Sequence, residues 1–236
     1  MPAAEPEFRS LIQLSHWPSH KSSLFKQQTA SVRRNLNHCN RVRIEFLAAD
    51  PPSQEFLLPI AMILYLMRHA NAGLARGNSV LDAKRSLVKE GKEQCMLMAR
   101  MLSALKVQVD VIVSSPLKRA RQTAQFVGTE LGFDGKVEVS EALLPTADFA
   151  AFQDMLAKYA QREGMLAVGH NPVLYQFLSR LIAGNGNAAI RMRKGSIARV
   201  DLDQHPPRLQ WLIDPRSARA IYASVAKSSR PKTSRK

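Results

Sequence analysis

The sequence predicts an α/β protein, a three-layer α/β/α sandwich built on a mostly parallel central sheet. Three short apolar segments support this prediction, because each of them runs directly into an amphipathic helix: residues 62–67, 109–113 and 165–168. Short continuous apolar runs are typical of strands that are buried on both faces, and strands that alternate with helices are typical of parallel sheets. We therefore expect helices on both faces of the sheet.

The other elements follow from hydrophobic periodicity and from helix boundary signals. Ser86 is a candidate N-cap, and Pro116 and Gly132 suit the two ends of one helix. On these signals we expect helices over residues 86–105, 116–132, 146–160 and 172–184. Alternating apolar residues predict a short strand over 136–140 and a terminal antiparallel pair over 196–203 and 208–213.

Composition divides the chain into three parts. Residues 1–61 are interrupted by prolines and show no sustained period, so we expect a poorly ordered N-terminal extension. Residues 62–214 contain all the predicted elements and form the expected domain. Residues 215–236 carry seven basic and no acidic side chains, and we expect a basic disordered tail. Because the first strand begins at Met62, translation from Met62 rather than Met1 stays open as an alternative.

Composition also argues against several classes of protein. Cys39 and Cys95 lie far apart without metal-ligand spacing, so we expect free thiols in a reducing, cytoplasmic setting and no metal. No apolar run has the length of a membrane span, and no secretory signal is evident. The net charge is +15, but nearly half of it lies in residues 215–236, so we expect no nucleic-acid partner. We expect a monomer.

Chemically capable side chains follow three of the predicted strands. Arg68 and His69 end the first, Ser114 and Arg119 follow the second, and His170 follows the third. Parallel strands would place these three junctions at one edge of the sheet, where α/β proteins bind ligands. Arginines, imidazoles and helix N-termini together suit a dianionic phosphoryl group. The alternative is that each cation is solvated independently and each histidine is an ordinary hydrogen-bonded core residue.

These junctions resemble the three motifs of the histidine phosphatase superfamily, which includes the phosphoglycerate mutases. The resemblance rests on residues 66–70 (LMRHA), 115–124 (SPLKRARQTA) and 169–172 (GHNP). Within that superfamily the chain is most similar to the small SixA-type phosphohistidine phosphatases. That closer likeness rests on residues 82–87 (DAKRSL) and 195–198 (GSIA).

The resemblance implies a phosphoglycerate mutase-like fold and a phosphatase that needs no cofactor. It implies that His69 is the nucleophile that becomes phosphorylated and that Arg68 and Arg119 bind the phosphoryl oxygens. It also implies that His170 binds the phosphoryl group and stabilises the developing charge. Arg85 matches an arginine of the SixA-type pattern and is expected to be an accessory contact.

A general acid is harder to identify. Glu141, directly after the short strand predicted over 136–140, is the first candidate, and Asp148 is the second. The alternative for both is a helix-capping or solvated carboxylate. The expected substrate is phosphohistidine in a protein, such as a phosphotransfer domain or carrier. A small phosphorylated metabolite is the nearest alternative. From a different class, the chain could be a non-catalytic basic binding module.

Overall fold

The computed structural model of this protein describes residues 62–75 and 77–228. The predicted N-terminal extension, the choice between Met1 and Met62 as start, and residues 229–236 lie outside the described residues. Across the part that is described, no helix is long and apolar enough to cross a membrane.

The described residues form an α/β domain around a six-stranded sheet with the order β3-β2-β4-β1-β5-β6. The strands are β1 (Ile63–Arg68), β2 (Val111–Ser114), β3 (Glu138–Val139), β4 (Gly164–Gly169), β5 (Ile197–Asp201) and β6 (Arg208–Ile213). Pairing is parallel from β3 through β2 and β4 to β1, whereas β5 is antiparallel to both β1 and β6. The predicted fold class, with its mostly parallel sheet and terminal antiparallel pair, is confirmed.

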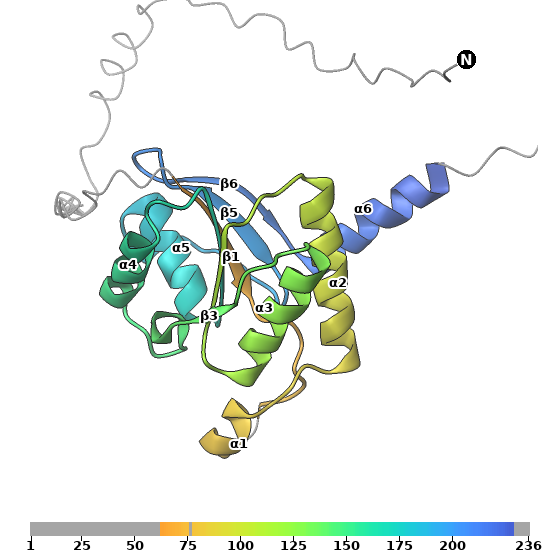
Figure 1. Ribbon diagram of the computed structural model, residues 1–236, viewed down its shortest axis with the longest axis horizontal. Helices are drawn as coiled ribbons and strands as arrows, with labels where there is room; N and C mark the ends of the chain where they lie inside the picture. The colour runs from red at the N-terminus through yellow and green to blue at the C-terminus, as the bar shows by residue number, and fades with distance from the viewer. Residues whose placement is uncertain (1–61, 76, 229–236) are drawn as a thin grey trace, which may run out of the picture. The chain divides into compact units, whose positions relative to one another are not determined.

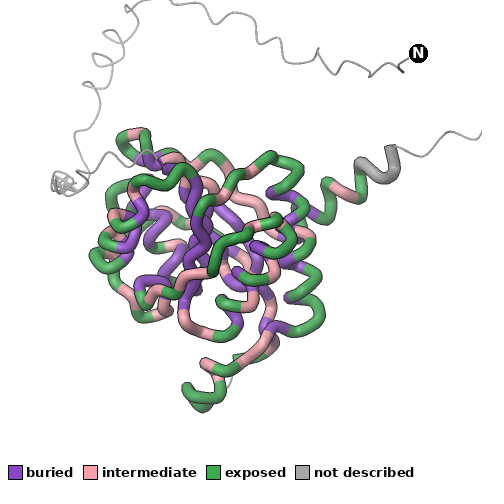
Figure 2. Tube along the Cα trace, in the orientation of Figure 1, coloured by how far each residue is buried: buried purple, intermediate pink, exposed green. Residues whose placement is uncertain are grey.

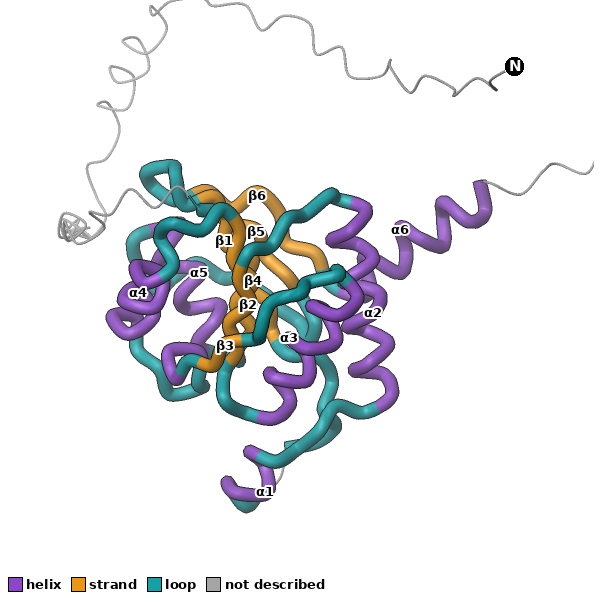
Figure 3. Tube along the Cα trace, in the orientation of Figure 1, coloured by secondary structure: helices purple, strands orange, loops and turns teal. Residues whose placement is uncertain are grey.

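Helices cover both faces of this sheet, as Figures 1 and 3 show. On one face lie η1 (Glu141–Leu143), α4 (Phe149–Lys158) and α5 (Val173–Ala183). On the other lie α2 (Lys89–Ala104), α3 (Lys118–Glu130) and α6 (Pro215–Ser228). The five-residue helix α1 (Ser79–Ala83) stands apart from these two layers, next to the loop that follows β1.

The alternation of side chains along each strand creates two hydrophobic clusters. In β1, Leu64 and Leu66 pack with α4 and α5, whereas Tyr65 and Met67 pack with α2 and α3. All four side chains are buried, which is what a strand covered on both faces requires. Figure 2 shows this buried centre running along the strands.

Several boundaries differ from the predicted ones. The loop expected between β1 and the next helix contains α1, whose N-cap is Asn78. Helix α2 is capped at Val88 rather than at Ser86, and the Val88 side chain makes no cap hydrogen bond. Helix α4 begins at Phe149 because Asp148 accepts a hydrogen bond from the Ala151 backbone N–H at 2.8 Å.

The expectation of disorder from residue 215 onward is wrong for residues 215–228, which form α6. Asp214 caps this helix, because its Oδ1 accepts hydrogen bonds from the backbone N–H groups of Arg216 (2.8 Å) and Ser217 (2.9 Å). Ala218 is fully buried in the cluster that includes α2, and Tyr222 packs against that cluster. Composition alone suggested a tail, but one small apolar side chain and a capping carboxylate hold the segment on the domain.

We predict that Ala218→Asp destabilises the protein by roughly 2–4 kcal/mol, because an ionised carboxylate would have to be buried without a partner. Ala220→Asp, a matched change at an exposed position of the same helix, should alter the free energy of unfolding by less than about 0.5 kcal/mol. Urea unfolding of both variants measures the difference. Equal stabilities would show that α6 does not pack on the domain.

Candidate active site

The parallel pairing of β1 and β4 brings the two histidine junctions together. Arg68 lies opposite Gly169 in the register, and the His69 backbone N–H donates to the Gly169 carbonyl at 3.0 Å. The imidazole rings of His69 and His170 lie with their centroids 5.0 Å apart and both are buried. The two junctions therefore lie together at the carboxyl ends of the parallel strands, as the sequence predicted.

The imidazole of His69 has a defined tautomer. Its Nδ1 lies 2.7 Å from the Ala70 carbonyl oxygen, which can only accept, so Nδ1 carries the proton and Nε2 carries the lone pair. Burial lowers the pKa of His69 to about 3; the Ala70 carbonyl opposes this shift, and Arg119, Arg68 and Arg85 add to it. At neutral pH the ring is therefore an uncharged base with a free Nε2.

The His170 ring is positioned by the hydroxyl of Ser115, which directly follows β2. Its Nε2 lies 2.9 Å from Ser115 Oγ, while its buried Nδ1 has no hydrogen-bond partner among the described residues. Burial lowers its pKa to about 2, and repulsion from Arg119, and from His69 once that ring is protonated, adds to the effect. Sequence reasoning pointed to Ser114, but that hydroxyl donates to the Ser115 carbonyl at 2.9 Å, so Ser115 is the site residue.

Arg68 is anchored by a backbone carbonyl. Its Nη1 donates to Met192 O at 2.9 Å, and Asn171 Nδ2 donates to the same oxygen at 3.0 Å. The buried Nε of Arg68 has no hydrogen-bond partner in the described part of the chain. Burial lowers the pKa of Arg68, yet a guanidinium stays charged at neutral pH. The role of Met192 could not be found from sequence, because a carbonyl contact leaves no signature in the side chain.

Arg119 and Arg85 are joined through Asp82 in α1. Arg119 Nη1 lies 2.9 Å from the Asp82 carbonyl and 3.1 Å from its Oδ2, and Arg85 Nε forms an ion pair with Oδ1 at 3.0 Å. Arg85 also donates to the carbonyls of Ala72 (3.2 Å) and Gly73 (3.0 Å), in the loop after His69. Arg119 is buried, and its Nε, like that of Arg68, lacks a hydrogen-bond partner within the described residues.

Asn71, which the sequence did not single out, fixes the loop after His69. Its backbone N–H donates to Gln94 Oε1 (2.9 Å), its Nδ2 donates to Glu90 Oε2 (2.7 Å), and its Oδ1 accepts from Lys194 Nζ (3.0 Å). Gly91 permits this approach, because a Cβ there would lie 2.0 Å from the Asn71 carbonyl oxygen. Gln94 is a buried polar residue inside an apolar helix face, which is the signal that could have identified this network.

The two candidate acids do not hydrogen-bond to either histidine. Asp148 caps α4, which is the structural role that the sequence left open for it. Glu141 is exposed at the start of η1 and makes no ion pair with another described residue. The η1 segment nonetheless lies at the same sheet edge, since the Ser140 backbone N–H donates to the Ser114 carbonyl at 2.9 Å.

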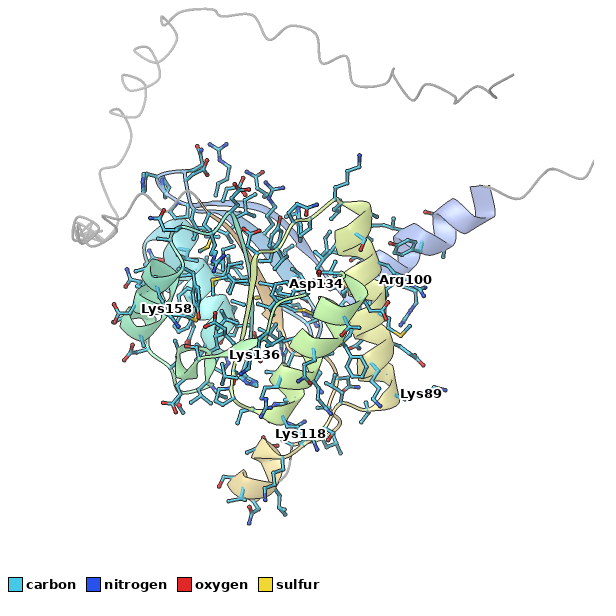
Figure 4. All side chains as sticks on the ribbon, viewed as in Figure 1. Lys89, Arg100, Lys118, Asp134, Lys136 and Lys158 are labelled. Atoms are coloured by element: carbon cyan, nitrogen blue, oxygen red, sulfur yellow. The ribbon has the colours of Figure 1, made fainter. Side chains whose placement is uncertain are left out.

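Two further observations concern cations and metal ligands. Arg121 is exposed and lines a separate hollow with Lys136 and Val139, so it does not join the site. Lys89 and Lys118, in the first turns of α2 and α3, project from the end of the domain near α1 (Figure 4). In the described ranges, no group of three or more His, Cys, Asp or Glu side chains is placed to hold a metal ion.

Comparisons with known proteins agree with this geometry. The profile of the histidine phosphatase superfamily (branch 1) matches residues 64–144. Phosphohistidine phosphatase SixA of Escherichia coli (strain K12) is 30% identical over 149 residues, which are 61% of this chain and 87% of SixA. The structure of the protein histidine phosphatase SixA complexed with tungstate is similar with a TM-score of 0.59 and 27% identity, over 66% of this chain and 98% of that one.

A more distant structure, the alpha-ribazole phosphatase from Shigella flexneri, shares the fold at 20% identity and a TM-score of 0.55, over 65% of this chain and 97% of that one. The fold and the paired histidines define a phosphatase of the phosphoglycerate mutase-like class. More particularly, the chain belongs to the histidine phosphatase superfamily, with phosphohistidine phosphatase SixA among its relatives.

The depressed histidine pKa values predict a pH-dependent stability. A base whose pKa is lower in the folded state contributes stability that is complete above its unfolded pKa of about 6.5 and is lost as the pH falls toward its folded pKa. For His69 and His170 the window runs from about pH 6.5 down to about 3 and 2. Each should cost about 1 kcal/mol between pH 7 and pH 5.5.

Urea unfolding at the two pH values measures this cost. We expect His69→Gln and His170→Gln each to remove about 1 kcal/mol of the difference in unfolding free energy between pH 7 and pH 5.5, because glutamine takes up no proton when the chain unfolds. A variant that keeps the full wild-type pH dependence would mean that the histidine it replaces titrates alike in the folded and unfolded chain.

Proposed function

We propose that this phosphatase removes the phosphoryl group from phosphohistidine in a protein substrate, through a covalent phosphohistidine intermediate and without a cofactor. One observation carries the proposal. A neutral His69 with a free Nε2 lies in a buried site where Arg68 Nε, Arg119 Nε and His170 Nδ1 have no hydrogen-bond partner among the described residues. Buried polar atoms are normally paired, and the oxygens of a phosphoryl group would pair both arginine donors, and His170 Nδ1 when that nitrogen carries a proton.

In the first step His69 Nε2 attacks phosphorus. The new N–P bond forms as the bond to the leaving imidazole breaks, and the leaving nitrogen takes a proton from solvent. In the second step water attacks phosphorus, the bond to His69 breaks, a proton returns to solvent and inorganic phosphate leaves. Splitting one displacement into two makes each easier. Nδ1–H donation to the Ala70 carbonyl keeps the correct nitrogen of His69 in position throughout.

The charged groups have separate roles in this proposal. Arg68 and Arg119 bind the phosphoryl oxygens, and their charge stabilises the transition state more than it stabilises the bound substrate. Burial lowers the pKa of His170, and a bound dianion beside the ring would raise that pKa and so favour protonation. Arg85 acts at one remove, by holding Asp82 and the loop after His69.

Two considerations favour a protein phosphohistidine over a small phosphate ester. SixA, the 30% identical relative, is a phosphohistidine phosphatase, and a SixA structure binds tungstate, a tetrahedral oxyanion. Imidazole also leaves more readily than an alkoxide, so a site in which neither Glu141 nor Asp148 hydrogen-bonds to the histidines suits a phosphoramidate. A metabolite phosphatase stays the alternative, since relatives that share the fold include the alpha-ribazole phosphatase.

The nucleophile provides the first test. We predict that His69→Ala abolishes turnover without loss of folding, and that brief exposure of the wild type to substrate leaves acid-labile phosphate on His69. His205→Ala, a matched change at an exposed histidine in the turn between β5 and β6, should keep wild-type turnover. Label found on His170 alone, or an active His69→Ala variant, would reverse the assignment.

The leaving group provides the second test. General acid catalysis is typically worth about 10²–10⁴-fold, so Glu141→Gln and Asp148→Asn should scarcely affect phosphohistidine hydrolysis if no acid is needed. Arg119→Ala should impair every substrate, because it removes phosphoryl binding itself. Rates on protein phosphohistidine, a phosphoserine peptide and a sugar phosphate measure both effects. Fast sugar phosphate hydrolysis that Glu141→Gln reduces about a hundredfold would instead make Glu141 the acid of a metabolite phosphatase.

A further inference from the structure

A cavity of about 710 Å³ adjoins the candidate active site, and its charge is strongly one-sided. Glu90 is the acidic residue in its lining, against six basic residues: Arg68, Arg191, Arg193, Lys194, Arg216 and Arg219. We call this cavity the flanking groove. Its lining comes from the end of β1 with the loop that follows, the first turns of α2, the start of α5, the segment before β5 and the start of α6.

The flanking groove is continuous with the site of chemistry. Arg68, Asn71 and Asn171 line it, and the same residues adjoin the two histidines along the chain. Arg68 and Asn171 are further tied together through the Met192 carbonyl, which both of them contact. A ligand whose phosphoryl group reaches His69 would therefore have its adjoining atoms next to the groove.

Three of the basic residues in the groove are not paired with an acidic side chain among the described residues. Arg193 forms an ion pair with Asp214 at 3.3 Å, and Lys194 is bound to Asn71 Oδ1. Arg191, Arg216 and Arg219, by contrast, are exposed and form no ion pair with another described residue.

Glu90, the acidic residue of the lining, keeps its charge but is engaged by neighbouring side chains. Glu90 accepts hydrogen bonds from Asn71 Nδ2 (2.7 Å) and Gln94 Nε2 (3.1 Å), so its oxygens are already occupied. Concentrated positive charge in a concave surface attracts anions and steers their approach. The lining therefore favours a ligand with several negative charges beyond the phosphoryl group itself.

We propose that the flanking groove binds a carboxylate-rich segment of the substrate protein, next to the phosphohistidine in its chain. This inference rests on the proposed function and names a feature of its substrate. The cavity is too large for a single phosphate, and Tyr175 and Ile190 add apolar surface that a polypeptide can cover. A single-stranded nucleic acid would call for several stacking aromatic side chains, whereas this lining contains one, Tyr175.

The test assays the full-length protein with two phosphohistidine peptides of equal length. One carries glutamate at the positions flanking phosphohistidine, and the other carries glutamine at the same positions. We expect the wild type to prefer the glutamate peptide in kcat/KM by roughly tenfold, because several exposed ion pairs each contribute a modest factor. The preference should shrink as salt rises, since exposed charges are screened.

Charge-reversal variants locate the effect. Combining Arg191→Glu, Arg216→Glu and Arg219→Glu should abolish or invert the preference while leaving hydrolysis of the glutamine peptide at the wild-type rate. The milder set Arg191→Gln, Arg216→Gln and Arg219→Gln should abolish it too, and this set guards against misfolding of the reversed variant. Arg162→Glu is the matched control. This exposed arginine precedes β4, so it lies at the opposite end of the strand from His170 and the candidate active site.

The outcomes separate this inference from the proposed function. Equal hydrolysis of both peptides by the wild type would overturn the docking role and leave the phosphohistidine activity standing. Hydrolysis of neither peptide would overturn the proposed function and this inference with it. Loss of glutamine-peptide turnover in the glutamine variants would place these arginines in the catalytic site. Stronger inhibition by a DNA oligonucleotide than by polyglutamate would assign the groove to nucleic acid instead.

Discussion

Positive charge enclosed in a buried space is the constraint on which the rest of the site depends. Arg68 and Arg119 are held by their Nη1 atoms, one on the Met192 carbonyl and the other on Asp82. In both arginines the buried Nε is left without a hydrogen-bond partner among the described residues. Leaving such donors unpaired is costly, and an oxyanion would remove that cost. The contacts at Nη1 thus restrain both arginines and leave their Nε–H groups available to a phosphoryl oxygen.

The same positive charge has a second effect, because it adds to the burial that keeps the histidines uncharged. Burial is the main cause of the lowered pKa of His69, and the neighbouring arginines strengthen it. An imidazole can act as a nucleophile only when it is neutral, so the arginines that would bind the phosphoryl group also help burial to keep His69 in its nucleophilic form. The Ala70 carbonyl then decides which nitrogen keeps the proton, and the β1–β4 register decides how near the second histidine lies.

Sequence reasoning predicted the parts of this arrangement that local patterns encode. Apolar runs located the strands, and the position of Arg68, His69 and His170 at strand ends predicted their convergence. The contacts that hold them were not predictable in the same way. The Asp82–Arg119 pair joins residues 37 positions apart, and Met192 acts through a backbone carbonyl. Helix α6 was missed because basic composition outweighed one buried alanine, whose packing partner in α2 no local pattern reveals.

Gly195 explains how the missed helix bears on the site. Its backbone N–H donates to the carbonyls of Arg68 (3.1 Å) and His69 (3.2 Å), and its φ of +78° is a conformation that favours glycine. A Cβ at this position would lie 2.9 Å from Pro215 Cγ, in the first turn of α6. The helix that carries Arg216 and Arg219 therefore begins next to Gly195, whose backbone is hydrogen-bonded to the end of β1. Gly195 thus contacts both the backbone of His69 and the start of α6. The distance from His69 to the proposed docking arginines of α6 is therefore set by packing rather than by a mobile loop.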